Sequence, residues 1–234
     1  MQFPFFYEAS LINTDTLFTL STETFKHAIQ VLRLKENDII QLTNGKGLLC
    51  TAILKNVDKK QAIAQINEVQ YIEPPLIKTC IAISLLKNTS RLEWFLEKAT
   101  ELGISAIMPI ICHRTEKQHF RFDRMNTILI SAMLQSQQVW LPTLHEPLIF
   151  NNIFQHTDYS LKLIAHCSYT EKKSLSSFAI QENSILLIGP EGDFSDEEIA
   201  LAKKNNYISV SLGNTRLRTE TAGVAGAVLL TINK

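Results

Sequence analysis

The chain has 234 residues, 45% of them hydrophobic and 20% charged, a composition typical of folded globular proteins and not of disordered ones. No apolar run is long enough for a membrane span. The N-terminal Phe3, Phe5 and Phe6 form too short a stretch, with no basic segment before it, for a signal peptide. The formal net charge of zero counts against a nucleic-acid partner but does not exclude one, because a basic face can coexist with an acidic back.

The cysteines are far apart in the sequence and form no C-x-x-C pair; they are Cys50, Cys80, Cys112 and Cys167. This pattern is typical of buried free thiols and does not indicate a disulfide framework or a zinc site. We therefore expect a cytoplasmic protein with no bound metal and no membrane partner.

The first part of the chain is predicted to be a small domain rich in strands. A helix is expected over residues 22–33, where apolar side chains recur at helical spacing. Strands are expected over residues 38–43, 48–57 and 61–71, with a glycine-containing turn between the first two. Pro74 and Pro75 mark a linker, because consecutive prolines continue neither a helix nor a central strand. Residues 1–72 are thus predicted to form a barrel-like domain.

The remainder, residues 76–234, is predicted to be an α/β domain. Buried strands are expected over residues 80–86, 104–112, 161–165, 185–188 and 208–212, the second of them interrupted by Pro109. Helices are expected over residues 91–102, 123–138, 195–205 and 219–232. Asp123 and a capping box at Ser195 mark two helix starts, and Gly103 marks a helix end. Such alternation indicates a mostly parallel sheet with helices on its faces.

Two polar loops each follow a predicted strand of this domain. The first is Gly189-Pro190-Glu191-Gly192-Asp193-Phe194, and the second spans residues 212–222, with Thr219 as a candidate N-cap of the last helix. Ligands of open α/β sheets bind at the carboxyl ends of the strands, where both loops lie. An ordinary turn and a capped helix with surface arginines remain the alternative, but two such loops together favour a shared site.

These loops also carry a resemblance to a known family. The Gly189-Pro190-Glu191-Gly192 turn, followed by Leu217-Arg218-Thr219-Glu220-Thr221-Ala222, resembles the RsmE family of ribosomal RNA uracil-N3 methyltransferases in the SPOUT superfamily. The segments His27–Leu34 and Glu97–Gly103 also resemble family segments, so the similarity covers nearly the whole chain.

The resemblance implies a fold, a cofactor and partners. Residues 1–72 would be a PUA-like RNA-binding barrel. Residues 76–234 would be a SPOUT domain that contains a trefoil knot and forms a homodimer through it. S-adenosylmethionine would methylate N3 of a uridine in 16S ribosomal RNA of the small subunit. Three strand-end loops would hold this cofactor, and the implied contacts are His166, Ile188, Gly189, Glu191, Gly192, Leu212, Gly213, Leu217, Arg218, Thr219, Thr221 and Ala222.

The chemistry of the site is assigned to charged residues. Arg218 is expected to orient or stabilise the base, and Glu220 to orient Arg218 or accept a proton. A carboxylate that only interacts with the helix dipole is the alternative for Glu220. Arg114 is a candidate RNA or active-site contact, or simply a solvated arginine. Expected RNA contacts, which could instead be solvated charges, are Lys26, Arg33, Lys117, Arg121 and Arg124.

Some positions depart from the family pattern. Asp193 stands where a second glycine is usual, and aspartate tolerates a left-handed backbone better than most residues. Residues 214–216 and 134–138 also differ, and the latter change puts substrate contacts from that helix in doubt. Alternative functions are methylation of another RNA position or a ribose hydroxyl, RNA binding without catalysis, and binding of a phosphorylated nucleotide. No Walker or G-x-G-x-x-G pattern supports the last of these.

Overall fold

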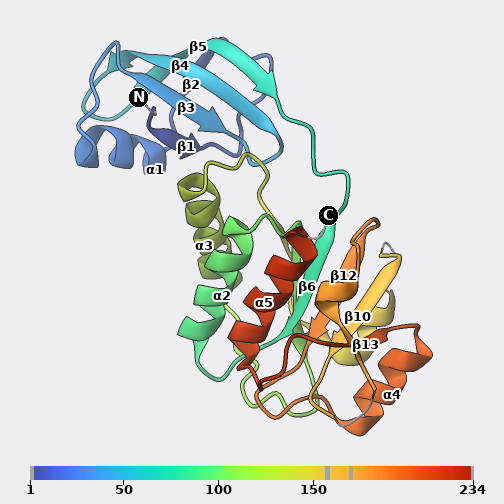
Figure 1. The fold of residues 1–234 in the computed structure, drawn as a ribbon. Helices are drawn as coiled ribbons and strands as arrows, with labels where there is room; N and C mark the ends of the chain where they lie inside the picture. Colours follow the sequence, from blue (N-terminus) through green and yellow to red (C-terminus); the bar gives the residue numbers. More distant parts are fainter. Residues whose placement is uncertain (1–2, 156–158, 169–170, 233–234) are drawn as a thin grey trace. The chain divides into compact units, whose positions relative to one another are not determined.

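The structure is a computed structural model that describes residues 3–155, 159–168 and 171–232. It divides into two compact units, shown in Figure 1. The first unit is Met1–Pro74 with Met133–Leu141, and the second is Pro75–Ala132 with Pro142–Lys234. The first boundary between the two units falls between the consecutive prolines Pro74 and Pro75.

A five-stranded sheet forms the first unit, in the order β1-β3-β4-β5-β2. Its strands are β1 (Phe5–Tyr7), β2 (Leu17–Thr19), β3 (Ile39–Thr43), β4 (Leu48–Val57) and β5 (Ala62–Tyr71). Alternate side chains of β4, such as Leu48, Cys50 and Ala52, are buried in the core. The Met133–Leu141 segment belongs to this unit. The Gly47 N–H donates to the Val139 carbonyl, the Leu141 N–H donates to the Gly45 carbonyl, and the Trp140 indole donates to the Ile72 carbonyl, each at 2.9 Å.

The helix expected over residues 22–33 is present but is not one regular α-helix. Helix α1 (Thr22–Phe25) is capped by the Ser21 side chain and continues as the π-helix η1 (Lys26–Val31). The Leu32 N–H donates to the His27 carbonyl, five residues back, which is the wider hydrogen-bond spacing of a π-helix. Apolar spacing predicted the helix and its buried face, but it does not distinguish these two backbone geometries.

A parallel sheet forms the centre of the second unit. Its order is β11-β13-β10-β12-β6-β7-β8, with β9 also paired to β7. The strands are β6 (Thr79–Ser84), β7 (Ala106–Ile111), β8 (Thr143–Leu144), β9 (Leu148–Ile149), β10 (Leu161–Ala165), β11 (Lys173–Ser174), β12 (Ser184–Ile188) and β13 (Ile208–Ser211). The predicted mostly parallel sheet is therefore confirmed.

Helices lie on both faces of this sheet. The helices after the linker are α2 (Thr89–Glu101), α3 (Phe122–Gln135), α4 (Asp196–Lys204) and α5 (Thr219–Ile232), with short 3-10 turns η2 (Phe150–Gln155) and η3 (Leu175–Ser177). Helix α5 packs on β6, on β12 and against α2, as Figure 1 shows. Ile199 and Ala202 of α4 belong to a core cluster on the opposite face, with Cys80 and Leu187.

The predicted end residues of α4 and α2 agree with the structure, whereas the predicted N-cap of α3 does not. The Ser195 capping box at α4 and the left-handed Gly103 after α2 are present as predicted. Helix α3 begins at Phe122, so Asp123 lies inside its first turn and is not its N-cap. An acidic residue in a first turn still interacts favourably with the helix dipole, which explains its position.

Strand β7 runs through Pro109 without interruption, contrary to the prediction. The carbonyls of Ser105 and Ile107 accept hydrogen bonds from Thr143 and His145, on the β8 side. By alternation, the nitrogen of Pro109 faces the same side, in the gap between the short strands β8 and β9. The missing N–H of proline therefore removes no ladder bond there.

The prediction that all four cysteines are buried is wrong for one of them. Cys50, Cys80 and Cys112 are buried free thiols, but Cys167 is exposed in the loop after β10. Burial raises the pKa of Cys50 to about 11 and that of Cys80 to about 12. Within the described ranges, no helix has the length and apolar character of a membrane span, and no three His, Cys, Asp or Glu side chains gather as metal ligands.

Replacement of Gly223 by alanine is expected to destabilise the second unit. A Cβ there would lie 2.7 Å from the Phe95 ring of α2 and 2.9 Å from Ile83 of β6, so α5 or these side chains would have to shift. Overpacking of this kind costs about 1–3 kcal/mol. At a helix position with free space around it, replacement of glycine by alanine would instead stabilise the fold by about 0.5–1 kcal/mol. Urea denaturation measures the change in the free energy of unfolding, and a Gly223→Ala variant more stable than the wild type would contradict this packing.

Candidate active site

Three loops leave neighbouring strands at one edge of the parallel sheet. The strands β13, β10 and β12 are adjacent, and Ala165 of β10 pairs with both Ile188 of β12 and Val210 of β13. Because all three strands are parallel, the segments that follow them leave the sheet at the same edge, beyond the carboxyl ends of the strands. These segments begin at His166, Gly189 and Leu212, as the sequence predicts for a shared site.

Asp193 joins two of the loops. It adopts a left-handed backbone with φ 65°, so the expected tolerance of aspartate for this geometry is confirmed. One carboxylate oxygen accepts from the Cys167 N–H at 2.7 Å, and the other accepts from the Phe194 N–H at 2.9 Å. A glycine at this position would supply neither bond. The departure from the family pattern therefore connects the loop after β12 to the loop after β10.

Arg114 holds the same turn from the segment after β7. Its guanidinium donates to the Gly192 carbonyl at 2.7 Å and to the Phe194 carbonyl at 3.2 Å. Through these two hydrogen bonds, Arg114 fixes the backbone of the Gly189–Phe194 turn.

Thr219 connects the second predicted loop to the first. Its hydroxyl donates to the Gly189 carbonyl at 3.0 Å, and its side chain is buried. The prediction that Thr219 is the N-cap is wrong, since Thr219 is the first residue of α5 and its hydroxyl bonds outside the helix. The carbonyl of Arg218 accepts from the Ala222 N–H, so Arg218 occupies the cap position.

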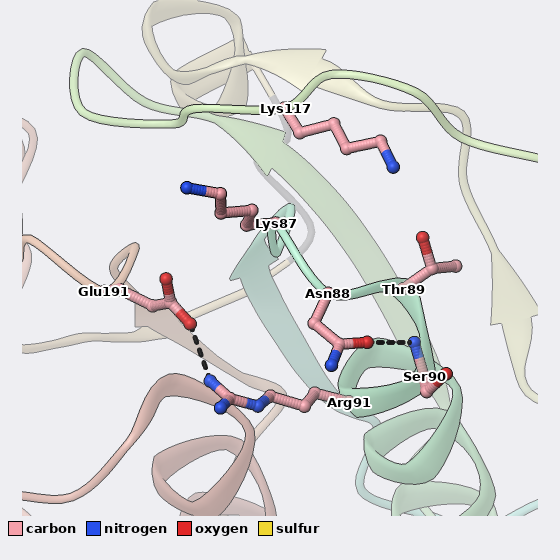
Figure 2. Close-up of a pocket in the computed structure, with 7 residues that line it drawn as sticks. All are labelled: Lys87, Asn88, Thr89, Ser90, Arg91, Lys117 and Glu191. Carbon is pink, nitrogen blue, oxygen red and sulfur yellow. Dashed lines mark hydrogen bonds and ion pairs between the residues drawn. The ribbon is translucent and has the colours of Figure 1, made fainter.

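Arg91 is a residue of this site that the sequence analysis missed. It lies in the first turn of α2, just after β6. Its Nη1 lies 2.8 Å from Glu191 Oε1, the contact drawn in Figure 2, and its Nε lies 3.6 Å from Glu220 Oε1. Because β6 is the neighbour of β12 in the sheet, applying the strand-end rule to β6 would have identified Arg91.

Glu220 and Arg218 are adjacent but have opposite environments. Glu220 is only 7% exposed, and its Oε2 has no hydrogen-bond partner among the described residues. A buried carboxylate oxygen without a donor is costly, so it marks a place where a ligand can supply one. Arg218 is exposed, and within the described part of the chain no hydrogen bond or ion pair holds its guanidinium.

Comparison with known proteins identifies the family. A family described as an RNA methyltransferase domain matches residues 73–231, and one described as an RNA methyltransferase PUA domain matches residues 20–67. The chain is 32% identical over 213 residues to ribosomal RNA small subunit methyltransferase E of Synechocystis, covering 87% of this chain and 69% of that protein. The chain belongs to the RsmE family of RNA methyltransferases.

Two solved structures share the fold over nearly the whole chain. A methyltransferase from Legionella pneumophila in complex with bound SAM has a TM-score of 0.88 at 29% identity, covering 99% of this chain and 98% of that one. Ribosomal RNA small subunit methyltransferase E from Neisseria gonorrhoeae, bound to S-adenosyl methionine, has a TM-score of 0.87 with the same identity and coverage. The predicted PUA-like and α/β architecture is thus confirmed, while the trefoil knot stays a prediction because strand order does not define threading.

The other predicted cofactor contacts of this RsmE-family chain lie in the same loops. Ile188 is buried at the end of β12, whereas Leu212 and Leu217 are half-buried. An added Cβ at Gly213 would meet nothing within 4 Å, so open space lies beside that loop. The exposed members of the predicted set, besides Arg218, are Glu191, Gly192, Gly213 and Thr221; Gly189 is buried and Ala222 is half-buried.

His166 is buried in the loop after β10. Its Nδ1 and the Ser168 hydroxyl are 2.7 Å apart, and its Nε2 and the Ser209 hydroxyl are 2.9 Å apart. Burial lowers the pKa of His166, and the nearby Lys172 ammonium lowers it further. Lys172 itself donates to the carbonyls of His166 and Ser168, which fixes this loop.

The lowered pKa of His166 predicts a loss of stability in acid. The unfolded chain takes up this proton near the ordinary pKa of about 6.5, and the folded chain only at lower pH. Between those values the unfolded state binds more protons, so stability falls as pH drops below about 6.5. Between about pH 7.5 and about pH 5.5, the thermal unfolding midpoint of His166→Gln should fall less than that of the wild type. An equal fall in both proteins would contradict this prediction.

Two adjoining cavities of the second unit share Thr89 and Lys117, and the larger one is also lined by Arg91. The larger, of about 730 Å³, is drawn in Figure 2 and is lined by Lys87, Asn88, Thr89, Ser90, Arg91, Lys117 and Glu191. The other, of about 250 Å³, is lined by Thr89, Glu93, Lys117, His119, Arg121 and Arg124. Three predicted RNA contacts, Lys117, Arg121 and Arg124, thus come together, although Arg124 also pairs with Glu93. The other two, Lys26 and Arg33, are exposed in the first unit.

Proposed function

We propose that this protein transfers a methyl group from S-adenosylmethionine to N3 of a uridine in 16S ribosomal RNA of the small subunit. The observation that carries the proposal is the buried, unpartnered Oε2 of Glu220 beside the exposed Arg218. A uracil offers N3–H to a carboxylate and, once deprotonated, a negative charge to a guanidinium. The relatives named for small-subunit RNA methylation, and the neighbour bound to S-adenosyl methionine, support the same substrate and cofactor.

The residues of the strand-end loops suit S-adenosylmethionine. Open space beside Gly213, the exposed Gly192 backbone and the apolar Ile188 and Leu217 side chains would hold a nucleoside through backbone and apolar contacts. When bound, the cofactor supplies an electrophilic methyl group on a positively charged sulfur. The carboxylates of Glu191 and Glu220 also lie near that edge of the sheet, where the Arg91 guanidinium pairs with both.

The chain's own residues would handle the proton and the charge. Glu220 would accept the N3 proton through Oε2, as a general base. Arg218 would stabilise the uracil anion that remains, and it would orient the ring for in-line attack. Arg114, with its guanidinium bound to two loop carbonyls, would act by positioning the turn at Gly192.

RNA would bind through the basic residues around the second cavity. Lys117, Arg121 and Arg124 would contact phosphates, and Lys26 and Arg33 would do so from the PUA-like unit. The target base has to leave its stack to reach Glu220, so an unpaired or flipped nucleotide is the expected substrate. We place this reaction in the cytoplasm because ribosomal particles are its substrate.

We also propose that the chain is a homodimer through α2 and α5. Trp94 of α2 is 43% exposed, and Ile232 of α5 is 71% exposed. Val224 and Val228 of α5 are only half-buried in the single chain. An apolar surface of this kind on two helices that pack together favours a second copy as the partner. Light scattering with size separation tests this by mass.

Nucleoside analysis tests the proposed reaction. Small-subunit RNA from cells that lack this protein would be incubated with the protein and S-adenosylmethionine, digested and examined by mass spectrometry. We expect one new 3-methyluridine. A different methylated base or a ribose-methylated nucleoside would favour a related RNA methyltransferase activity. The absence of any methylation on free RNA and on small subunits alike would contradict catalysis.

A further inference from the structure

We propose that Arg91 is the positioning residue that fixes one oxygen of Glu220 and leaves the other as the proton acceptor. This inference rests on the proposed function, because it assigns the support for its general base. Arg91 comes from α2, whereas Glu220 comes from α5, so the ion pair joins two separate elements.

The two oxygens of Glu220 differ in their surroundings. Oε1 lies 3.6 Å from Arg91 Nε, whereas Oε2 is buried without a hydrogen-bond donor among the described residues. A carboxylate held at one oxygen keeps the other in a fixed place, and fixed placement is what a general base requires. Without Arg91, the Glu220 side chain would lose the only ion pair found for it in the described ranges.

Arg91 is itself held by a second carboxylate. Its Nη1 pairs with Glu191 at 2.8 Å, so one guanidinium contacts the loop after β12 and the start of α5 (Figure 2). The planar fork of arginine can contact two carboxylates through separate nitrogens, whereas the single ammonium of lysine offers one point charge. Arg91 also lines the larger of the two cavities.

Kinetics of Arg91→Ala test this role. We expect kcat for methyl transfer to fall about 10-fold to 100-fold, with the Kd for S-adenosylmethionine changed less than about 3-fold, since misplacement of a catalytic group costs rate and not cofactor affinity. The kcat of Arg91→Lys should lie between the kcat values of the wild type and of Arg91→Ala. The matched control is Lys98→Ala, which removes a cation paired with Glu97 and Glu101 on the same helix and should keep wild-type kcat.

A double-mutant cycle distinguishes action through Glu220 from a direct role. In a Glu220→Gln background, Arg91→Ala should cost less than about 3-fold in kcat, because the group that it positions is already disabled. Full loss in that background would overturn the proposal, as would a parallel loss of cofactor affinity in the single variant. If Arg91→Ala does not fold, Arg91→Lys is compared in the same cycle.

The same cycle on thermal unfolding midpoints needs neither cofactor nor RNA. The fall in midpoint caused by Arg91→Ala should be smaller in the Glu220→Gln background than in the wild type. Strictly additive falls would overturn the contact on which the proposal stands. Failure of the proposed function is distinguishable, because it would appear as missing methylation by the wild-type protein.

Discussion

Replacement of Arg218 by alanine is expected to reduce kcat for methyl transfer about 100-fold to 1000-fold, the usual cost of removing one charge-stabilising donor. The guanidinium is exposed and makes no hydrogen bond or ion pair with the described residues, so its removal breaks no contact of the fold. Stability and cofactor affinity should therefore stay close to those of the wild type. Single-turnover methylation with saturating cofactor measures the chemical step.

Arg216→Ala is the matched control for that experiment. Arg216 is an exposed arginine two residues earlier in the same loop, and loss of its charge changes the general field of the loop equally. We expect its kcat to remain within about 3-fold of wild type, because general field effects are weak for exposed charges. Equal losses in the two variants would assign the effect to net charge, and full activity of Arg218→Ala would remove that residue from the mechanism.

Replacement of Glu220 by glutamine is expected to lower kcat about 100-fold to 10,000-fold, the range for loss of a general base. Glutamine keeps the shape of the side chain but cannot take up the N3 proton. The buried Oε2 without a donor is the observation behind this expectation. The rate should be measured with saturating RNA, so that binding does not limit it.

The alternative for Glu220, a carboxylate that only stabilises the start of α5, makes a different prediction. A helix-dipole contact is worth about 0.3–1 kcal/mol of stability, and its loss would leave kcat unchanged. Glu197→Gln, an exposed first-turn position of α4, is the comparison for that effect. A Glu220→Gln variant that loses only stability would support the dipole role and contradict proton transfer.

The sequence predicted the site at the level of loops because the relevant signals are local. Apolar runs located the central strands, and the strand-end rule then placed the turns at Glu191 and Arg218 together. The structure confirms this convergence through the hydrogen bond from Thr219 to Gly189. Capping patterns likewise predicted the starts of α4 and α5 to within a residue.

The missed features depend on contacts between distant residues. The strand-end rule applied to β6 places Arg91 near the site, but its partners Glu191 and Glu220 are about 100 and 130 residues away, and local sequence does not predict the two ion pairs. Strands of two or three residues, such as β1 and β8, are too short for periodicity to reveal. The Met133–Leu141 segment belongs to the first unit, which local sequence does not predict.

A calorimetric titration with S-adenosylmethionine tests most directly whether the loops after β10, β12 and β13 form a cofactor site. We expect saturable binding of one molecule per chain, competition by S-adenosylhomocysteine and no competition by ATP. Absence of binding, or preference for the phosphorylated nucleotide, would contradict the methyltransferase site and every catalytic role assigned to it.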